Sequence, residues 1–176
     1  MRRVALLATF AACLVLGACA PGTAPAGGPA TAGPAPVTAP AGGATEAWMS
    51  DMLARINAER STAGAGALQL CARLTTAAQA HSGDQAATNT MSHTGSNGST
   101  MSQRIEAAGY TGWSALAENV AMGYPSVSSV MDGWMNSPGH RANLLSASYL
   151  HVGLGRAASA SGTLYWTQDF GRGGAC

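Results

Sequence analysis

Apolar residues recur at helical spacing in several stretches of the chain. In 46–60 they fall at three- and four-residue steps, which predicts a first helix with one buried face. The stretch 72–88 predicts a second helix, and shorter helices are predicted at 101–108 and in the segment from Pro125 to the Pro138-Gly139 pair, which should end it. The buried stripe of the second helix, extended back along the chain, comprises Leu70, Leu74, Ala77, Ala78 and His81.

Three later stretches are rich in β-forming residues. "AENVAMG" at 117–123 predicts a brief strand, and "HVGLGRAAS" and "GTLYWTQDFG" predict an antiparallel hairpin near the C-terminus. Helices before and after a small antiparallel sheet indicate a layered α+β domain.

His81 is predicted to face the core of that domain. A histidine in such a place is more often a hydrogen-bonded packing residue than a ligand. We therefore leave it outside the candidate site.

The N-terminus has the pattern of a bacterial export signal. Arg2 and Arg3 precede an apolar run from Val4 to Leu16 that is shorter than a typical membrane span. The residues "LGAC" that end at Cys19 resemble a lipoprotein cleavage site, which implies a signal peptide at 1–18 and a lipid on Cys19. The alternative is an ordinary secreted protein that is cleaved near Ala20.

A Pro-, Ala- and Gly-rich stretch follows this cysteine as far as residue 44. It has almost no large apolar side chain to bury, so we expect 19–44 to be a lipidated tether and 45–176 to be the folded domain. The protein would then be exported and held by lipid on the cell envelope, on the outer membrane if the host has one.

Charge and cysteine content narrow the possible functions. The chain carries nine basic and eight acidic residues, and loss of the signal would remove two of the basic ones, so a nucleic-acid partner is not expected. Cys13 would leave with the signal and Cys19 would carry lipid. Cys71 and Cys176 remain, and in an oxidising compartment they are expected to form a disulfide, the alternative being two reduced thiols.

Three ionisable residues outside the core helices are candidates for chemistry. His93 lies in a Gly- and Ser-rich loop, Glu118 in an otherwise apolar strand and His140 directly after the Pro-Gly pair. A carboxylate in a buried strand is costly unless it is paired, so Glu118 requires a partner. Two histidines and one glutamate match the ligands of some open zinc sites, although no compact zinc motif is present.

Motifs along the chain resemble a known family when they are taken in order. "SHTGSNG", "RIEAAGY", "AENVAMG", Trp134, "SPGHRANLL", "VGLG" and "YWTQDFG" occur in the order seen in the bacterial branch of the CAP superfamily, whose domain is also called SCP. The resemblance covers about residues 48–171. It implies a three-layer α-β-α sandwich whose cavity is lined by two histidines and two acidic residues, and which binds zinc in some members.

The resemblance places His93, Glu118 and His140 at three of these four cavity positions. At the fourth, where animal members have a second glutamate, this chain has Ser137. A mechanism that needs a second carboxylate as general base is therefore in doubt, whereas three ligands still suffice for an exchangeable metal. Of the neighbouring residues, Arg141 is expected to pair with a carboxylate and Asn143 to hydrogen-bond locally.

Two functions compete at this stage. The first is a binding module, expected to be a monomer, that holds a small molecule, a lipid or a protein partner. The second is a zinc-assisted hydrolase that acts on envelope or extracellular substrates through His93, Glu118 and His140. We favour the binding module, because the missing acid leaves no evident general base and because a fold does not by itself imply an activity. Nucleophilic catalysis ranks third, since the chain has no Gly-x-Ser-x-Gly motif.

Overall fold

The computed structural model describes residues 42–176, with side chains from residue 47 onward. The predicted signal peptide, the lipidation site Cys19 and nearly all of the predicted tether lie outside the described residues. The first helix begins at Gly42, within the last residues assigned to the tether.

Helices and strands follow the predicted order with small changes at their ends. The helices are α1 (Gly42–Thr62), α2 (Ala72–Thr88), α3 (Met101–Ala107), α4 (Val127–Asn136) and α5 (Pro138–Leu145). The strands are β1 (Gln69–Leu70), β2 (Ala115–Met122), β3 (His151–Ala158) and β4 (Leu164–Arg172). Among the described residues, no helix is both long and apolar enough to cross a bilayer.

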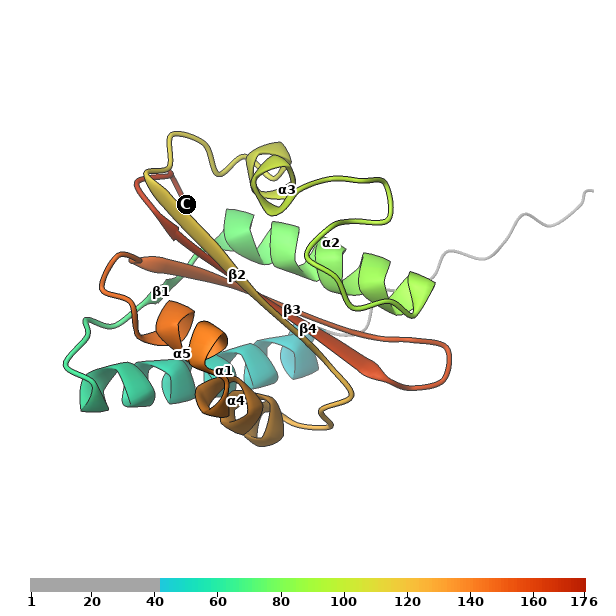
Figure 1. The fold of residues 1–176 in the computed structure, drawn as a ribbon, viewed down its shortest axis with the longest axis horizontal. Coiled ribbons are helices and arrows are strands. Elements are labelled where there is room, and N and C mark those ends of the chain that lie inside the picture. Colours follow the sequence, from blue (N-terminus) through green and yellow to red (C-terminus); the bar gives the residue numbers. More distant parts are fainter. Residues whose placement is uncertain (1–41) are drawn as a thin grey trace, which may run out of the picture. The chain divides into compact units, whose positions relative to one another are not determined.

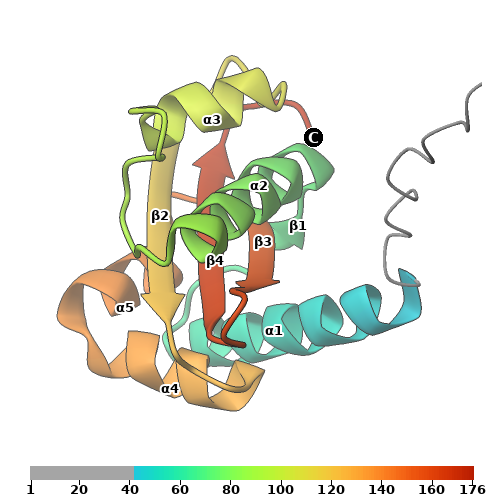
Figure 2. The ribbon, with the colours of Figure 1, turned by 90° about the vertical axis from the view of Figure 1, so that its right-hand side faces the viewer.

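The elements form three layers, as the predicted α+β class and sandwich require. Figure 1 shows α2 and α3 on one face of the sheet, with α1, α4 and α5 on the other face, and Figure 2 shows the same layers from the side. The strand order is β1-β3-β4-β2, so that the last strand of the chain lies in the interior of the sheet.

The sheet is mixed, whereas a wholly antiparallel one was expected. β4 pairs antiparallel with β2 and β3, but β1 pairs parallel with β3 through Gln69 and Leu70. Two residues are too few to show an alternating pattern, which is why β1 escaped prediction. Leu70 thus belongs to an edge strand, where it is exposed, and not to the buried stripe of the second helix.

The Pro138-Gly139 pair starts a helix as well as ending one. Ser137 is both the C-cap of α4 and the N-cap of α5, and Pro138 follows it at the first position of α5. Proline is tolerated there because the amide hydrogen it lacks would have no partner within the helix. His140 therefore lies inside α5.

Two apolar clusters fill the spaces between the layers. The larger lies between the sheet and the layer of α1, α4 and α5, and includes Met52, Ile56, Trp134, Trp166 and Phe170. The smaller includes Leu74, Ile105 and Tyr110 beside the predicted disulfide of Cys71 and Cys176, which the structure confirms. This bond fixes residue 176 beside the start of α2.

Helix α2 lies directly against β3 because two glycines leave room for it. A Cβ atom on Gly153 would lie 2.0 Å from the carbonyl carbon of Leu74, and one on Gly155 would lie 2.1 Å from the carbonyl oxygen of Ala78. No side chain can occupy either place without moving the helix. The "VGLG" motif therefore sets the distance between α2 and the sheet.

Candidate functional site

Glu118 is the centre of a buried group of charged side chains. It lies on β2 with only 2% of its side chain exposed. Its Oε1 atom accepts a hydrogen bond from Nδ1 of His93 at 2.8 Å, and its Oε2 atom accepts one from Arg104 at 2.5 Å. The carboxylate thus has the partners that its burial requires.

Arg104, on α3, was not foreseen as part of this site. Besides Glu118, its guanidinium binds the carbonyl oxygens of His93 at 3.1 Å and of Ser99 at 3.0 Å. It therefore holds the loop that carries His93 against β2. The helix from which it extends is fixed in turn by a capping box between Thr100 and Gln103.

His81 is buried, as predicted, yet it also approaches Glu118. It is 1% exposed, and its Nε2 atom lies 2.8 Å from the carbonyl oxygen of Ser92 and 3.9 Å from Oε2 of Glu118. Since a carbonyl only accepts, Nε2 carries the hydrogen in this contact. Burial is the largest effect on the His81 pKa and lowers it, so the ring is held neutral.

Asp169 is a second buried carboxyl group next to Glu118. It lies opposite Glu118 in the β2–β4 register and is fully buried, and neither of its oxygens receives a hydrogen bond from a described donor. Burial raises the pKa of Asp169 well above its usual value, and the nearby negative charge of Glu118 raises it further. A proton on Asp169 removes the repulsion between these two buried carboxyl groups.

Because of this raised pKa, we expect Asp169→Asn to increase stability at neutral pH. In the folded protein Asp169 holds its proton, whereas the unfolded chain releases it above about pH 4, so its contribution to stability falls as pH rises through the folded-state pKa. Asparagine is neutral in both the folded and the unfolded chain and so avoids that cost. Urea unfolding at pH 5 and pH 8 should show a gain of about 1 kcal/mol or more at the higher pH, since one pKa unit corresponds to about 1.4 kcal/mol.

The matched control is Asp132→Asn on α4, where the carboxylate is exposed in a surface ion pair with Arg55. It should leave the pH profile nearly unchanged. A profile for Asp169→Asn that parallels the unmodified protein would show that Asp169 is ionised when folded.

His140 approaches this group from the opposite layer. Asn119 donates a hydrogen bond to the carbonyl oxygen of His140 at 3.2 Å, and Asn143 donates to the backbone of Glu118 at 3.3 Å and to the side chain of Asn119 at 2.9 Å. These bonds tie α5 to β2. Asn143 therefore acts between elements, and not locally as predicted.

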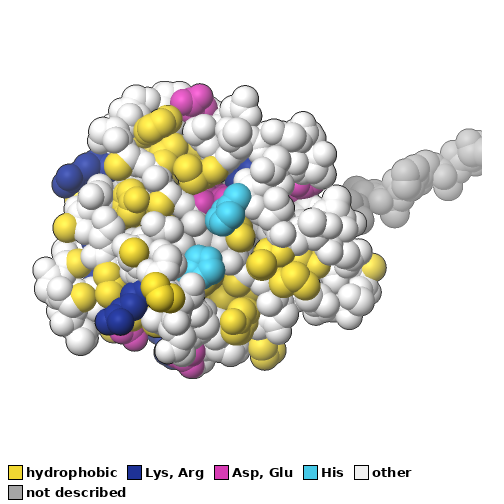
Figure 3. All heavy atoms as spheres, viewed as in Figure 1, with side chains coloured by type: hydrophobic (Ala, Val, Ile, Leu, Met, Phe, Trp, Pro, Cys, Tyr) yellow, Lys and Arg dark blue, Asp and Glu magenta, His cyan; other side chains and the backbone are white. Residues whose placement is uncertain are grey.

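His93 is close enough to His140 to affect its pKa, and histidine side chains lie near one another on the molecular face shown in Figure 3. Burial lowers the pKa of His140, and the nearby His93 lowers it further, so a neutral ring is favoured there. His93 itself remains 61% exposed.

The cavity beside Glu118 contains only part of the predicted triad. It has a volume of about 290 Å³ and is lined by His93, Glu118, Thr94, Thr100 and Met101, without His140. The prediction that Arg141 pairs with a carboxylate is also wrong. Arg141 is exposed, and no described carboxylate lies within ion-pair distance of it. The arginine of the site is Arg104.

Sequence comparison decides the family. Residues 53–170 match the profile of the Cysteine-rich secretory protein family, CAP. The chain belongs to the CAP family.

Relatives and solved structures agree with a CAP domain. YkwD of Bacillus subtilis is 31% identical over 142 residues, and the membrane protein YlbC of the same organism is 33% identical over 90 residues. The aligned parts make up 81% and 51% of this chain but only 54% and 24% of those proteins. The chain thus corresponds to about half of YkwD and a quarter of YlbC.

Solved structures of other proteins share the fold. An extracellular protein of Bacillus anthracis that contains an SCP domain has a TM-score of 0.65 and 27% identity, with 72% of this chain and 41% of that chain covered. An outer surface protein of Borrelia burgdorferi has a TM-score of 0.67 and 23% identity, with 73% and 94% covered.

In the arrangement just described, Glu118 is not free to bind a zinc ion together with His93 and His140. Both oxygens of Glu118 are already engaged, one by Nδ1 of His93 and the other by the cationic Arg104. Between residues 47 and 176, no three His, Cys, Asp or Glu side chains are placed to hold one metal ion. Binding through His93, Glu118 and His140 would require Glu118 to leave Arg104.

Proposed function

We propose that this protein is an exported CAP-domain binding module, anchored by lipid on Cys19, that recognises its ligand or partner at the cavity beside Glu118. The observation that supports this most directly is the way His93 is held. Its Nδ1 atom is fixed on a buried carboxylate, and most of its ring is exposed. When the ring is neutral, Nε2 is left as an oriented acceptor toward solvent.

The partners of Glu118 also support recognition without a metal. Arg104 balances the charge of the carboxylate and fixes the loop 92–100, so the cavity is organised before any ligand arrives. Preorganisation of this kind increases affinity because little ordering remains to be done on binding. The ligand class that suits it is a small molecule, lipid headgroup or protein side chain with a hydrogen-bond donor for His93.

A hydrolase is the second candidate, because His93 and Glu118 also have the geometry of a general base and its orienting carboxylate. No described serine, threonine or cysteine hydrogen-bonds to His93 through its side chain, and the position of the second family carboxylate is Ser137. Hydrolysis would therefore need a metal-bound water, as in the zinc-assisted alternative. We place this function second.

Zinc titration distinguishes the metal-free binding module from the zinc-assisted hydrolase. We expect Arg104→Gln to bind zinc at least tenfold more tightly than the unmodified protein, because the change removes a cation that lies 2.5 Å from the carboxylate. Calorimetric titration of the purified proteins measures this. The control is Arg73→Gln on α2, an arginine that binds only backbone carbonyls on the surface.

Tight zinc binding by the unmodified protein, abolished in His93→Ala, Glu118→Gln and His140→Ala alike, would contradict the metal-free proposal and favour the hydrolase. His81→Ala, a change in a buried histidine bound to backbone, serves as the histidine control.

The binding function itself is tested by mass spectrometry of molecules that remain bound to the protein after purification from membranes. We expect a bound species that is lost in His93→Ala but retained in His151→Ala, a histidine that contacts Tyr110 elsewhere. Turnover of ester, peptide or glycan substrates that disappears in His93→Ala would instead establish an enzyme.

The proposed anchor is tested by Cys19→Ser. Export is supported by the extracellular and outer-surface proteins that share this fold. We expect the variant to move from the membrane fraction to the soluble fraction, with the thermal unfolding of the domain unchanged, because the lipid supplies the membrane affinity. Membrane association that persists in Cys19→Ser would contradict lipidation at this residue.

A further inference from the structure

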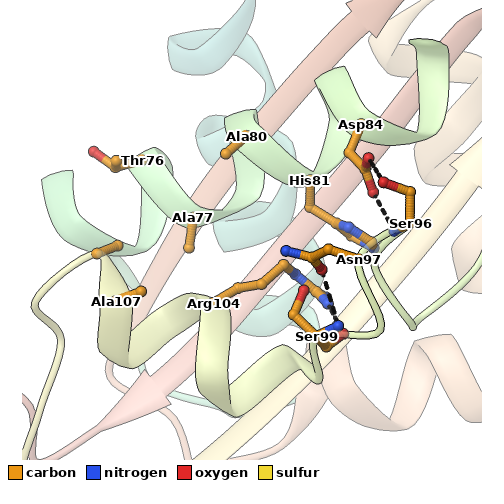
Figure 4. A pocket seen from close by; sticks show the side chains of 11 residues that line it. Thr76, Ala77, Ala80, His81, Asp84, Ser96, Asn97, Ser99, Arg104 and Ala107 are labelled. Carbon is orange, nitrogen blue, oxygen red and sulfur yellow. Dashed lines mark hydrogen bonds between the residues drawn. The ribbon is translucent and has the colours of Figure 1, made fainter. Parts of the chain in front are cut away.

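A second and larger cavity lies between α2 and α3, apart from the one proposed for recognition. Its volume is about 390 Å³, within the range of small-molecule sites. Figure 4 shows it enclosed by one side of α2, by α3 and by the loop between them. Its lining includes the polar residues His81, Asp84, Ser96 and Arg104 and several alanines.

The apolar part of this cavity is made by alanines. Ala77 and Ala80 on α2 and Ala107 on α3 line the cavity (Figure 4), and Ala108, which follows α3, lines it as well. Side chains of this size leave the space between the helices unfilled, and larger ones would close it. A stripe of small residues is only packing unless polar groups around it also lack partners.

Two side chains that line the cavity each have a buried polar atom without a hydrogen-bond partner among the described residues. These atoms are Nδ1 of His81 and Nε of Arg104. In Figure 4 the two side chains extend from α2 and α3 into the space between the helices. Buried polar atoms without partners are rare and costly, and they point to a group that is bound there.

The roles of these two atoms are fixed by what the rest of each side chain does. Since Nε2 of His81 donates to the carbonyl of Ser92, Nδ1 of the neutral ring is an acceptor. The Nε–H group of Arg104 is a donor, while its other nitrogens already bind Glu118 and two carbonyls. One atom therefore needs a donor and the other an acceptor, and a hydroxyl group supplies both.

The charges around the cavity favour a neutral ligand. Arg104 is balanced by Glu118, and Asp84 on α2 accepts hydrogen bonds from the backbone and side chain of Ser96. Among the described residues that line the cavity, no unbalanced positive charge is left to hold an anion.

We propose that this cavity, lined by His81, Arg104 and the four alanines, is a second binding site, for a small neutral molecule with a compact apolar body and a hydroxyl group. The site is independent of the ligand proposed at His93. It shares Arg104 with that region, because the same guanidinium reaches Glu118.

The test uses three probes that share a six-carbon ring: cyclohexanol, cyclohexanone and cyclohexanecarboxylate. Amide NMR shifts of the purified protein are followed during titration with each probe. We expect saturable shifts confined to α2, α3 and the loop 92–100, with millimolar affinity for cyclohexanol. Cyclohexanone lacks the donor for His81 and should bind at least threefold more weakly, and the carboxylate should not bind.

Ala107→Leu should reduce cyclohexanol affinity at least tenfold, because the longer side chain fills the cavity from an exposed position of α3. The matched control, Ala54→Leu on the exposed side of α1, should bind as the unmodified protein does. Unchanged binding by Ala107→Leu, shifts that do not saturate, or ketone and alcohol binding with equal affinity would each overturn the proposal.

Discussion

Gly153→Ala should lower the free energy of unfolding by about 4 kcal/mol or more, or prevent folding altogether. The new methyl group would lie 2.0 Å from the carbonyl carbon of Leu74 and 2.3 Å from the amide nitrogen of Thr75. Both are backbone atoms of a regular helix, so no side-chain rotation relieves the clash. Either α2 moves away from the sheet or β3 distorts, and overpacking against backbone belongs to the most damaging class of point substitution.

Urea unfolding followed by circular dichroism measures this effect, and Gly83→Ala provides a control of opposite sign. Gly83 lies on α2, the helix that Gly153 faces, and no atom lies within 4 Å of a Cβ built on Gly83. Alanine at that position should raise stability by about 0.5–1 kcal/mol through helix propensity. If Gly153→Ala cost less than about 1 kcal/mol, α2 would not be in direct contact with β3.

Arg60→Met should destabilise the protein by about 3–5 kcal/mol. Arg60 is 1% exposed and donates hydrogen bonds to the carbonyl oxygens of Gly66 at 2.7 Å, Leu144 at 2.7 Å and Ser146 at 2.9 Å. Methionine fills much of the volume but leaves three carbonyls without their donor, and a bond to a charged group is worth more than a neutral one. Burial lowers the pKa of Arg60 from its ordinary value, but an arginine remains protonated.

The same unfolding measurement applies, with Arg73→Met as the control. Arg73 also binds two backbone carbonyls, those of Gly109 and Ala175, but at the surface, where water can replace it. Its loss should cost about 1 kcal/mol. A cost for Arg60→Met as small as that for Arg73→Met would mean that the carbonyls at the end of α5 find other partners.

The sequence best predicted the elements in which a pattern of apolar residues repeats several times. The second helix was expected at 72–88 and occupies Ala72–Thr88, because its alanine-rich stripe is long and uninterrupted. The strand β1 has two residues and exists only because β3 provides a parallel partner, so no local signal marks it. The start of α5 was missed because proline was taken as an end, when it equally suits a first helical turn.

The candidate site was predicted in part, and for a physical reason. Glu118 stood out because a carboxylate in an apolar strand needs a partner, and Asp169, in the equally apolar "YWTQDFG", could have been found by the same argument. Arg104 could not, since an arginine on a short helix is usually solvated. Arg104 binds Glu118 only because α3 lies over β2, and no local sequence pattern predicts that packing.

The position of β4 has a consequence for when the domain can fold. Residues 164–172 are synthesised after β2 and β3, yet both of those strands pair with them. Among the residues that the structure describes, a chain that stops before residue 164 has no strand pairing beyond that of β1 with β3, so β2 stays unpaired until residues 164–172 have emerged. Late, non-local pairing slows folding. In a protein that we propose is threaded through a membrane from its N-terminus, such a delay keeps the chain open for transport and postpones assembly of the Glu118 site to the far side.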